Sequence, residues 1–309
     1  MPREIVGPVR VRVPAKINLH LAVGDPRADG YHDLVTVFHA VDVYDELVIS
    51  RAQRLSVRTT AASTTTASAV PSGAKNLAGA AARALALRLG VPPAVSIRIA
   101  KQIPVAGGMA GGSADAAGAL VGCAALWGAD LSRDVLAEVG AGLGSDVPFA
   151  LSGGTAVGTG RGERLSPVLS RTPLHWVLAL ADGGLSTPAV FAELDRLRAD
   201  GSPPRTGEVQ AMLTALATGD PAQVAAEMSN DLQAAAFSLR PDLRRTVRAG
   251  LDAGALGGVV SGSGPTVALL AADPGAAAGI AAELAGSGTC RSVRIATGPV
   301  PGARVVATG

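Results

Sequence analysis

The sequence predicts a globular protein of two domains that mix helices with strands. At 309 residues the chain can build two separate cores, and its 48% hydrophobic and 17% charged residues are typical of well-buried folds. Patterns of strands and of helices occur in both halves. A Pro-, Arg- and Ser-rich stretch that ends at Pro173 lies between the halves, so we expect domains over residues 1–165 and 166–309.

Strands are predicted at the start of the chain. Alternating valines predict a strand or strand pair over residues 9–21, with Lys16 and Asn18 on the same face. After a turn, a second apolar alternation predicts two strands that meet near Asp45. The Thr-, Ala- and Ser-rich segment 59–72 is expected to form a loop.

A helix, a strand, a glycine-rich loop and a second helix are predicted next. Asn76 is a good N-cap for a helix whose leucines recur at helical spacing and which ends at Gly90. The strand 95–99 leads into the glycine loop, and Ser113 is the expected N-cap of the helix that follows it. A further short helix is expected to begin at Ser132.

The glycine-rich loop lies in the stretch Ile103 to Gly118, which reads IPVAGGMAGGSADAAG. Glycines let a ligand approach the backbone closely, and the start of a helix supplies unpaired N–H groups with partial positive charge. A tight turn is the plainer explanation of such a cluster. The stretch lacks the Lys-Ser/Thr pair of a P-loop, and its glycines do not fit the G-x-G-x-x-G fingerprint. It predicts a phosphate cradle whose positive charge comes from elsewhere in the chain.

The second half repeats the mixture of helices and strands. Ser186-Thr187-Pro188 predicts the start of a helix, with Phe191 one turn inside it. The segment SGSGPT, residues 261–266, lies between two apolar runs, where the usual explanation is a hairpin turn. Further helices are expected over residues 209–216, 221–228, 243–251 and 275–284, and strands over 176–180 and 293–296.

Composition argues against several classes of function. The net charge is +2 and the 27 basic residues are scattered, so a nucleic-acid platform is not supported. Cys123 and Cys290 lie far apart without Cys or His neighbours at metal-binding spacing, which gives zinc and redox chemistry no support. The first residues lack the apolar core of a signal peptide, and no apolar run is long enough to span a bilayer. We expect a cytoplasmic protein that contacts neither nucleic acid nor membrane.

Three segments together resemble the motifs of the GHMP kinase superfamily: PAKINLHL at residues 14–21, IPVAGGMAGGSADAA at 103–117, and SGSGPT at 261–266. With DGYHDLVTVFHAVDVYDEL, GSDVPF, STP and NDL, the chain is most similar to the branch that phosphorylates 4-diphosphocytidyl-2-C-methyl-D-erythritol. The resemblance implies an α+β fold with a nucleotide-binding N-terminal domain, a ferredoxin-like C-terminal domain and an active site between them. It also implies a left-handed β-α-β unit, whereas general rules favour the right-handed form.

The activity implied by this resemblance is transfer of phosphate from ATP to the 2-hydroxyl of that substrate, giving the 2-phosphate and ADP in the non-mevalonate route to isoprenoids. Asp146, between flexible glycines and a rigid Val-Pro pair, matches the family's general base, although a turn residue is the plainer explanation of an isolated Gly-Ser-Asp. Lys16 is expected to keep Asp146 ionised and to meet the γ-phosphate. Mg²⁺ is expected with ATP, and its ligands stay unassigned.

The resemblance also assigns the two binding sites. It implies that cytosine stacks between Tyr31 and Phe191, that His32 bonds the polar edge of the base, and that Asn18 and Thr187 orient the erythritol and diphosphate. The residues expected around the nucleotide belong to the glycine loop, with two lesser contacts: Pro104, Val105, Ala106, Gly107, Gly108, Met109, Ala110, Gly111, Gly112, Ser113, Ala114, and then Asn76 and Lys101.

The loop departs from the usual family pattern at Met109, Ala110 and Ala114. Alanine is compatible with binding by backbone N–H groups, but the missing hydroxyl at Ala114 leaves Ser113 as the one hydroxyl there. This puts any phosphate or Mg²⁺ contact from position 114 in doubt.

Two alternatives stay open. Another small-metabolite kinase of the superfamily, of the homoserine or mevalonate type, would have no use for the cytosine contacts of Tyr31, His32 and Phe191. A ligand-binding member without catalysis would not need Lys16 and Asp146. The oligomeric state, a monomer or a weak dimer, is not decided by the sequence.

Overall fold

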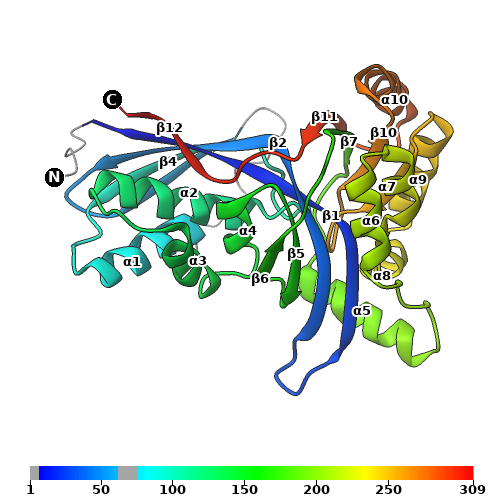
Figure 1. Cartoon of the computed structure of the whole chain (residues 1–309), viewed down its shortest axis with the longest axis horizontal. Coiled ribbons are helices and arrows are strands. Elements are labelled where there is room, and N and C mark those ends of the chain that lie inside the picture. The colour runs from blue at the N-terminus through cyan, green and yellow to red at the C-terminus, as the bar shows by residue number, and fades with distance from the viewer. Residues whose placement is uncertain (1–6, 62–75, 309) are drawn as a thin grey trace.

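The computed structural model describes residues 7–61 and 76–308, which form two sheets with their helices (Figure 1). The first sheet has eight strands among the described residues: β1 (Val9–Pro26), β2 (His32–Arg51), β3 (Ser56–Ala61), β4 (Val95–Lys101), β5 (Thr155–Gly160), β6 (Arg164–Pro167), β8 (Ser229–Asn230) and β12 (Arg304–Thr308). Their order is β12-β1-β2-β4-β3, with β5 beside β2, β6 beside β5, and β8 beside β1.

Helices cover one side of this sheet, as Figure 1 shows. They are α1 (Leu77–Leu89), α2 (Gly111–Leu126), α3 (Arg133–Ala141) and α4 (Val147–Ser152). The predicted cap of α1 is confirmed, because Asn76 accepts a hydrogen bond from the Ala78 N–H and Gly90 is left-handed at φ 68°. The cap at Ser132 is confirmed as well, since its side chain accepts from the Val135 N–H.

The predicted start of α2 is wrong by three residues, because the N-cap is Ala110 and not Ser113. The helix begins at Gly111, and the residue before it, Ala110, is left-handed at φ 58° with no capping side chain. Ser113 therefore lies inside the first turn. The consequence is favourable for anion binding, because no side chain of the N-cap residue satisfies the first N–H groups of the helix.

The long strands β1 and β2 pair along nearly their whole length and extend beyond the helix layer towards the second domain (Figure 1). The prediction of two strands meeting near Asp45 is wrong, because β2 is continuous. Its pairing with β1 jumps from Pro14↔Tyr44 to Ala15↔Val41, which is a bulge. On one side of the bulge β2 pairs with β4, and on the other with β5, so the strand changes its partner.

A β-α-β unit is present in the first sheet. Strands β3 and β4 are parallel, and α1 lies between them in the chain. The hand of the crossover stays a prediction. Of the expected loop 59–72, residues 59–61 belong to β3 and the others lie outside the described residues.

The second sheet contains β7 (Leu174–Leu180), β9 (Gly257–Val260), β10 (Val267–Ala271) and β11 (Ser292–Gly298) in the antiparallel order β11-β7-β10-β9. With its helices this is the β-α-β-β-α-β arrangement of a ferredoxin-like domain, which confirms the expected fold class. The helices are α5 (Thr187–Ala199), α6 (Gln210–Thr218), α7 (Pro221–Glu227), α8 (Leu232–Leu239), α9 (Asp242–Asp252) and α10 (Pro274–Ser287).

The segment 261–266 is the connection of the β9–β10 hairpin, as expected. Strands β3, β6, β8 and β12 and helices α4 and α8 were not foreseen. Because β12 pairs with β1, the end of the chain returns to the first sheet. The boundary between residues 165 and 166 stays a prediction.

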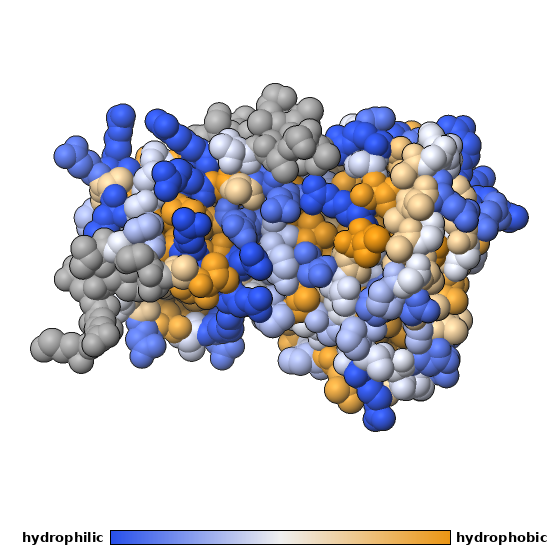
Figure 2. All heavy atoms as spheres, turned by 90° about the horizontal axis from the view of Figure 1, so that it is seen from above, coloured by the Kyte–Doolittle hydropathy of each residue, from blue (hydrophilic) through white to orange (hydrophobic). Residues whose placement is uncertain are grey.

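Buried hydrophobic side chains join the two domains. One cluster runs from the inward face of β1, through α2, to Trp176 and Leu178 of β7. Figure 2 shows from above that hydrophobic residues also reach the surface in patches between charged side chains, and the exposed ones include Ile295 and Val306 on the last two strands. Within the described ranges, we find no helix long and apolar enough to cross a bilayer.

Candidate active site

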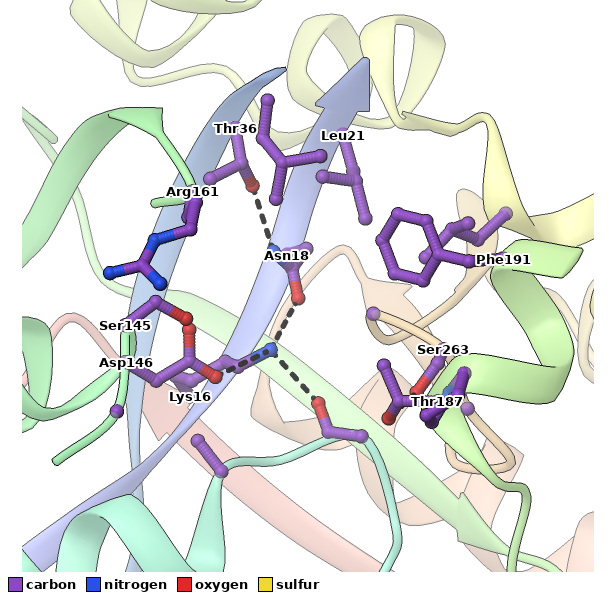
Figure 3. Close-up of a pocket in the computed structure, with 18 of the residues that line it drawn as sticks. Lys16, Asn18, Leu21, Thr36, Ser145, Asp146, Arg161, Thr187, Phe191 and Ser263 are labelled. Atoms are coloured by element: carbon purple, nitrogen blue, oxygen red, sulfur yellow. Dashed lines mark hydrogen bonds and ion pairs between the residues drawn. The ribbon is translucent and has the colours of Figure 1, made fainter. Parts of the chain in front are cut away.

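A cavity of about 1110 Å³ lies where the two domains meet. It is lined by the glycine loop, the paired strands β1 and β2, the turn before α4, the start of α5 and the 261–266 hairpin loop. In Figure 3, Lys16, Asn18 and Asp146 lie on one side of this space, and Thr187, Phe191 and Ser263 lie across from them. The volume exceeds that of most single-ligand pockets, which suits two ligands bound side by side.

Lys16 is the buried cation of the cavity. Its side chain comes from β1, where the residue is 7% exposed. The ammonium donates to Asn18 Oδ1 at 2.7 Å and to the carbonyl of Gly108 at 3.1 Å, and it lies 3.8 Å from Asp146 Oδ2. Burial lowers the pKa of Lys16, and Asp146 opposes that effect. The lysine therefore links strand β1, the glycine loop and the acidic turn.

Asn18 holds the lysine in position. Its amide nitrogen donates to Thr36 Oγ1 at 2.8 Å, and that hydroxyl donates to the carbonyl of His20 at 2.7 Å. Because the nitrogen is already engaged, the amide oxygen faces Lys16. The substrate contact that the resemblance implies for Asn18 stays a prediction; in the structure the oxygen and the nitrogen of its amide each bond a protein group.

Asp146 occupies the N-cap position of α4 without capping it. Its backbone is already helical at φ −85° and ψ −7°, and its side chain makes no capping hydrogen bond. Pro148 lies in the first turn, where it needs no N–H partner. The carboxylate is 28% exposed and lies beside Lys16, so it is open to the cavity (Figure 3).

The glycine loop packs against the 261–266 loop of the other domain. The carbonyl of Gly108 accepts from Ser261 Oγ at 3.0 Å, and that of Gly107 accepts from the Thr266 N–H at 3.3 Å. Gly108 is left-handed at φ 76°, and a Cβ there would lie 2.0 Å from the Ser261 carbonyl oxygen. No other residue type fits this approach of two backbones.

Asn230 holds the 261–266 loop from behind. Its amide donates to the carbonyls of Val260 and Gly262 at 2.8 and 2.7 Å, and its oxygen accepts from the Leu232 N–H. In the NDL segment, Asn230 therefore holds the 261–266 loop in place.

The expected nucleotide contact of Lys101 is not supported by its surroundings. Its ammonium is buried beneath the loop and bonds Asp45 Oδ2 at 2.5 Å, Asp115 Oδ2 at 2.9 Å and the Gly111 carbonyl at 2.9 Å. All three hydrogens of the ammonium are used in this way. Asp45 Oδ1 accepts the N–H groups of Gln102 and Ile103. This cluster supports the base of the loop.

The remaining loop residues divide into two sets. The cavity is lined by Pro104, Ala106, Gly107, Gly108, Ala110, Gly111 and Gly112. Met109 and Ala114 are buried in the core. A hydroxyl in place of the methyl group of Ala114 would therefore face apolar neighbours. Neither Val105 nor Ser113 belongs to the cavity lining, and Asn76 acts as the cap of α1.

His32, Phe191 and Tyr31 lie at the outer end of the cavity. The ring of His32 packs on Phe191 with centroids 5.0 Å apart, and its Nε2 lies 2.9 Å from Asp195 Oδ1. Tyr31 is 54% exposed, and the guanidinium of Arg161 lies 5.2 Å from its ring centroid. All three residues named from the sequence therefore line the cavity, and His32 and Phe191 are in ring contact.

The residues of this lining that sequence reasoning missed include Arg161, Asp195 and Ser263. Ser263 shares a hydrogen bond of 2.9 Å with Thr187. Asp195 follows Phe191 by one helical turn, a spacing that brings two side chains to the same face and could have indicated it. Arg161 lies in a glycine-flanked turn and carried no signal of this kind.

The models of the GHMP kinases N terminal domain and the GHMP kinases C terminal match residues 76–154 and 212–290. The chain is 63% identical over 302 residues to the 4-diphosphocytidyl-2-C-methyl-D-erythritol kinase of Nocardia farcinica (strain IFM 10152), covering 98% of this chain and 97% of that protein.

Two solved structures resemble the fold. The crystal structure of a 4-(cytidine 5'-diphospho)-2C-methyl-D-erythritol kinase matches with TM-score 0.75 and 33% identity, covering 93% of this chain and 98% of that one. A homoserine kinase from Cytophaga hutchinsonii ATCC 33406 matches with TM-score 0.75 at 19% identity, covering 98% of this chain and 99% of that one. The second likeness shows the fold alone.

Proposed function

The chain belongs to the GHMP kinases, in the branch of the 4-diphosphocytidyl-2-C-methyl-D-erythritol kinases, and on that premise we propose how its cavity performs the reaction. It is an ATP-dependent kinase of the non-mevalonate isoprenoid pathway. The reaction is transfer of the γ-phosphoryl group of ATP to the 2-hydroxyl of the cytidine substrate. The observation that carries the assignment is the Lys16–Asp146 pair, at 3.8 Å, beside a glycine loop with an uncapped helix start.

Asp146 takes the proton of the attacking hydroxyl, and Lys16 stabilises charge on the phosphoryl group as it moves. In phosphoryl transfer the protein mainly positions the reactants and neutralises charge, so a fixed cation next to a base supplies much of what is needed. The pair supports this proposal because Lys16 is oriented by Asn18 and Gly108 and not by Asp146 alone. The carboxylate therefore stays free to accept a proton.

The glycine loop binds the phosphates of ATP. Backbone N–H groups at the start of α2, together with the helix dipole, favour a polyanion there. Mg²⁺ would accompany ATP and would neutralise part of the charge on its phosphates. Within the described part of the chain no group of three or more His, Cys, Asp or Glu residues could hold a metal, which suits an ion carried mainly by the nucleotide.

The cytidine end of the substrate binds at His32 and Phe191, with Tyr31 across the base. Their grouping at the outer end of the cavity supports this assignment. Arg161 meets the diphosphate. Among the described residues that line the cavity, Lys16 and Arg161 are the lysine and arginine side chains. No described carboxylate pairs with the guanidinium of Arg161, whose recorded contact is the ring of Tyr31. Thr187 and Ser263 face the linking part of the substrate.

The alternative of a homoserine or mevalonate kinase has the same fold but no need for an aromatic site at the outer end of the cavity. A member without catalysis would not require a base beside Lys16. The oligomeric state and a cytoplasmic location stay predictions.

A coupled assay of ADP release tests the proposed function. We expect turnover with 4-diphosphocytidyl-2-C-methyl-D-erythritol and background rates with homoserine and with mevalonate. Turnover of either small alcohol at a higher kcat/KM than the cytidine substrate would favour the first alternative. Binding of the cytidine substrate without ADP release would favour the second.

A further inference from the structure

Asp195 lies within hydrogen-bond distance of one ring nitrogen of His32. Its Oδ1 lies 2.9 Å from His32 Nε2, and His32 is 7% exposed. The imidazole also packs against Phe191, so its orientation is fixed on two sides. An ionised carboxylate accepts hydrogen bonds and cannot donate them. In the neutral ring, the proton therefore resides on Nε2.

The second ring nitrogen, Nδ1, is then an acceptor. A neutral imidazole that carries its proton on Nε2 holds a lone pair on Nδ1. No described residue bonds this atom, and it is absent from the buried polar atoms that lack a partner. Since His32 lines the cavity, Nδ1 is accessible to a ligand that enters it.

Cytosine and uracil differ in the group at position 4 of the pyrimidine ring. Cytosine presents an amino group that donates there, whereas uracil presents a carbonyl oxygen that accepts. A lone pair on Nδ1 bonds the amino group and repels the carbonyl oxygen. Stacking on Phe191 does not separate the two bases, because both have similar faces.

We propose that Asp195 is a positioning residue that makes the cavity select cytidine diphosphate substrates over their uridine counterparts, by fixing the Nε2–H form of His32. This inference rests on the proposed function, because it takes His32 to meet the edge of the pyrimidine. The alternative is an ion pair that only supports the local structure. If the pair only supports the local structure, removing it would change kcat/KM by the same factor for both substrates.

The test compares kcat/KM for the cytidine and uridine forms of the substrate in the wild type and in Asp195→Asn. Asparagine keeps the shape, but its amide can donate to Nε2 as well as accept from it, so the ring can move its proton to Nδ1. We expect the preference for cytidine to fall by about tenfold or more, mainly through KM, with the uridine substrate unchanged or improved.

Asp200→Asn is the matched control, at the C-cap of the same helix. Its side chain is 69% exposed and pairs with Arg196. We expect both specificity constants to keep their wild-type values in this variant, because Asp200 does not line the cavity.

The tautomer itself is measured by ¹H–¹⁵N correlation spectra of the imidazole nitrogens, with His32 assigned through a His32→Gln variant. We expect Nε2–H in the wild type and a mixture in Asp195→Asn. A proton on Nδ1 in the wild type, or an equal loss of both substrates in Asp195→Asn, contradicts this inference alone. A wild-type protein that phosphorylates neither pyrimidine substrate contradicts the proposed function together with the inference.

Discussion

Lys16 Nζ lies 3.8 Å from Asp146 Oδ2, with further bonds from the lysine to Asn18 and to the Gly108 carbonyl. The two residues come from a strand of the first sheet and from the turn before α4. Because the ammonium is held from three sides, removing the charge of Asp146 leaves Lys16 in place. The pair can therefore be tested one residue at a time.

Asp146→Asn should lower kcat by about two to four orders of magnitude, which is the usual cost of losing a general base. Binding of ATP and of the cytidine substrate should change little, because the amide keeps the shape. Stopped-flow turnover and calorimetric titration measure the two effects. Asp134→Asn, an exposed carboxylate on α3, is the control. Near-normal turnover in Asp146→Asn would remove this residue from the role of base.

Lys101→Met should destabilise the protein and weaken ATP binding. It leaves Asp45 and Asp115 facing each other without their cation, and breaking one partner of a buried ion pair typically costs about 3–5 kcal/mol. The Gly111 carbonyl also loses its partner, which should raise KM for ATP. Urea unfolding and steady-state kinetics measure these changes.

Arg98→Met serves as the control for Lys101→Met, because Arg98 is exposed on the same strand. If the Lys101 variant kept wild-type stability and lost only ATP affinity, Lys101 would be a direct nucleotide contact after all.

Asp115→Asn should change how stability depends on pH. Burial raises the pKa of Asp115 from 3.8 to about 8, against the opposite effect of Lys101. Between these values the folded protein holds a proton that the unfolded chain has released, so stability falls as pH rises. Asparagine does not titrate. The variant should therefore gain stability relative to the wild type from about pH 4 to about pH 8 in urea unfolding. If the wild type instead became more stable relative to Asp115→Asn as the pH rises, the raised pKa of Asp115 would be contradicted.

Gly108→Ala should disrupt the contact between the two domains. The new Cβ would lie 2.0 Å from the Ser261 carbonyl oxygen at a left-handed φ, so the loops must separate. We expect a loss of stability of about 1–3 kcal/mol and a marked fall in kcat/KM. Gly112→Ala controls for stability, because its Cβ would meet only Leu77 Cδ1 at 3.4 Å. Equal thermal stability of both variants would contradict the packing argument.

Features set by neighbouring residues were predictable from the sequence. Asn76 and Gly90 bound α1 as expected because a cap depends on the residues next to it. The start of α2 was missed because Ala110 takes a left-handed conformation that alanine rarely adopts. Strand β2 appeared to break near Asp45 because a bulge shifts the alternation of its residues.

Part of the candidate site was likewise predictable from the sequence, and part of it was not. Lys16 and Asp146 were named through the resemblance, and the fold brings them together. The surroundings of Lys101 could not be foreseen, because Asp45 and Asp115 reach it from a different strand and from α2. Asp195 and Arg161 depend on how α5 and the β5–β6 turn approach β2, and local sequence does not determine that approach.

The most direct test of the central claim is a ³¹P NMR spectrum of the complete reaction with ATP, Mg²⁺ and 4-diphosphocytidyl-2-C-methyl-D-erythritol. We predict one new phosphomonoester signal that grows in step with ADP while the diphosphate of the cytidine substrate stays intact. Inorganic phosphate in place of the phosphomonoester, or cleavage of the substrate diphosphate, would contradict the assignment of the cavity as a site of phosphoryl transfer to the 2-hydroxyl.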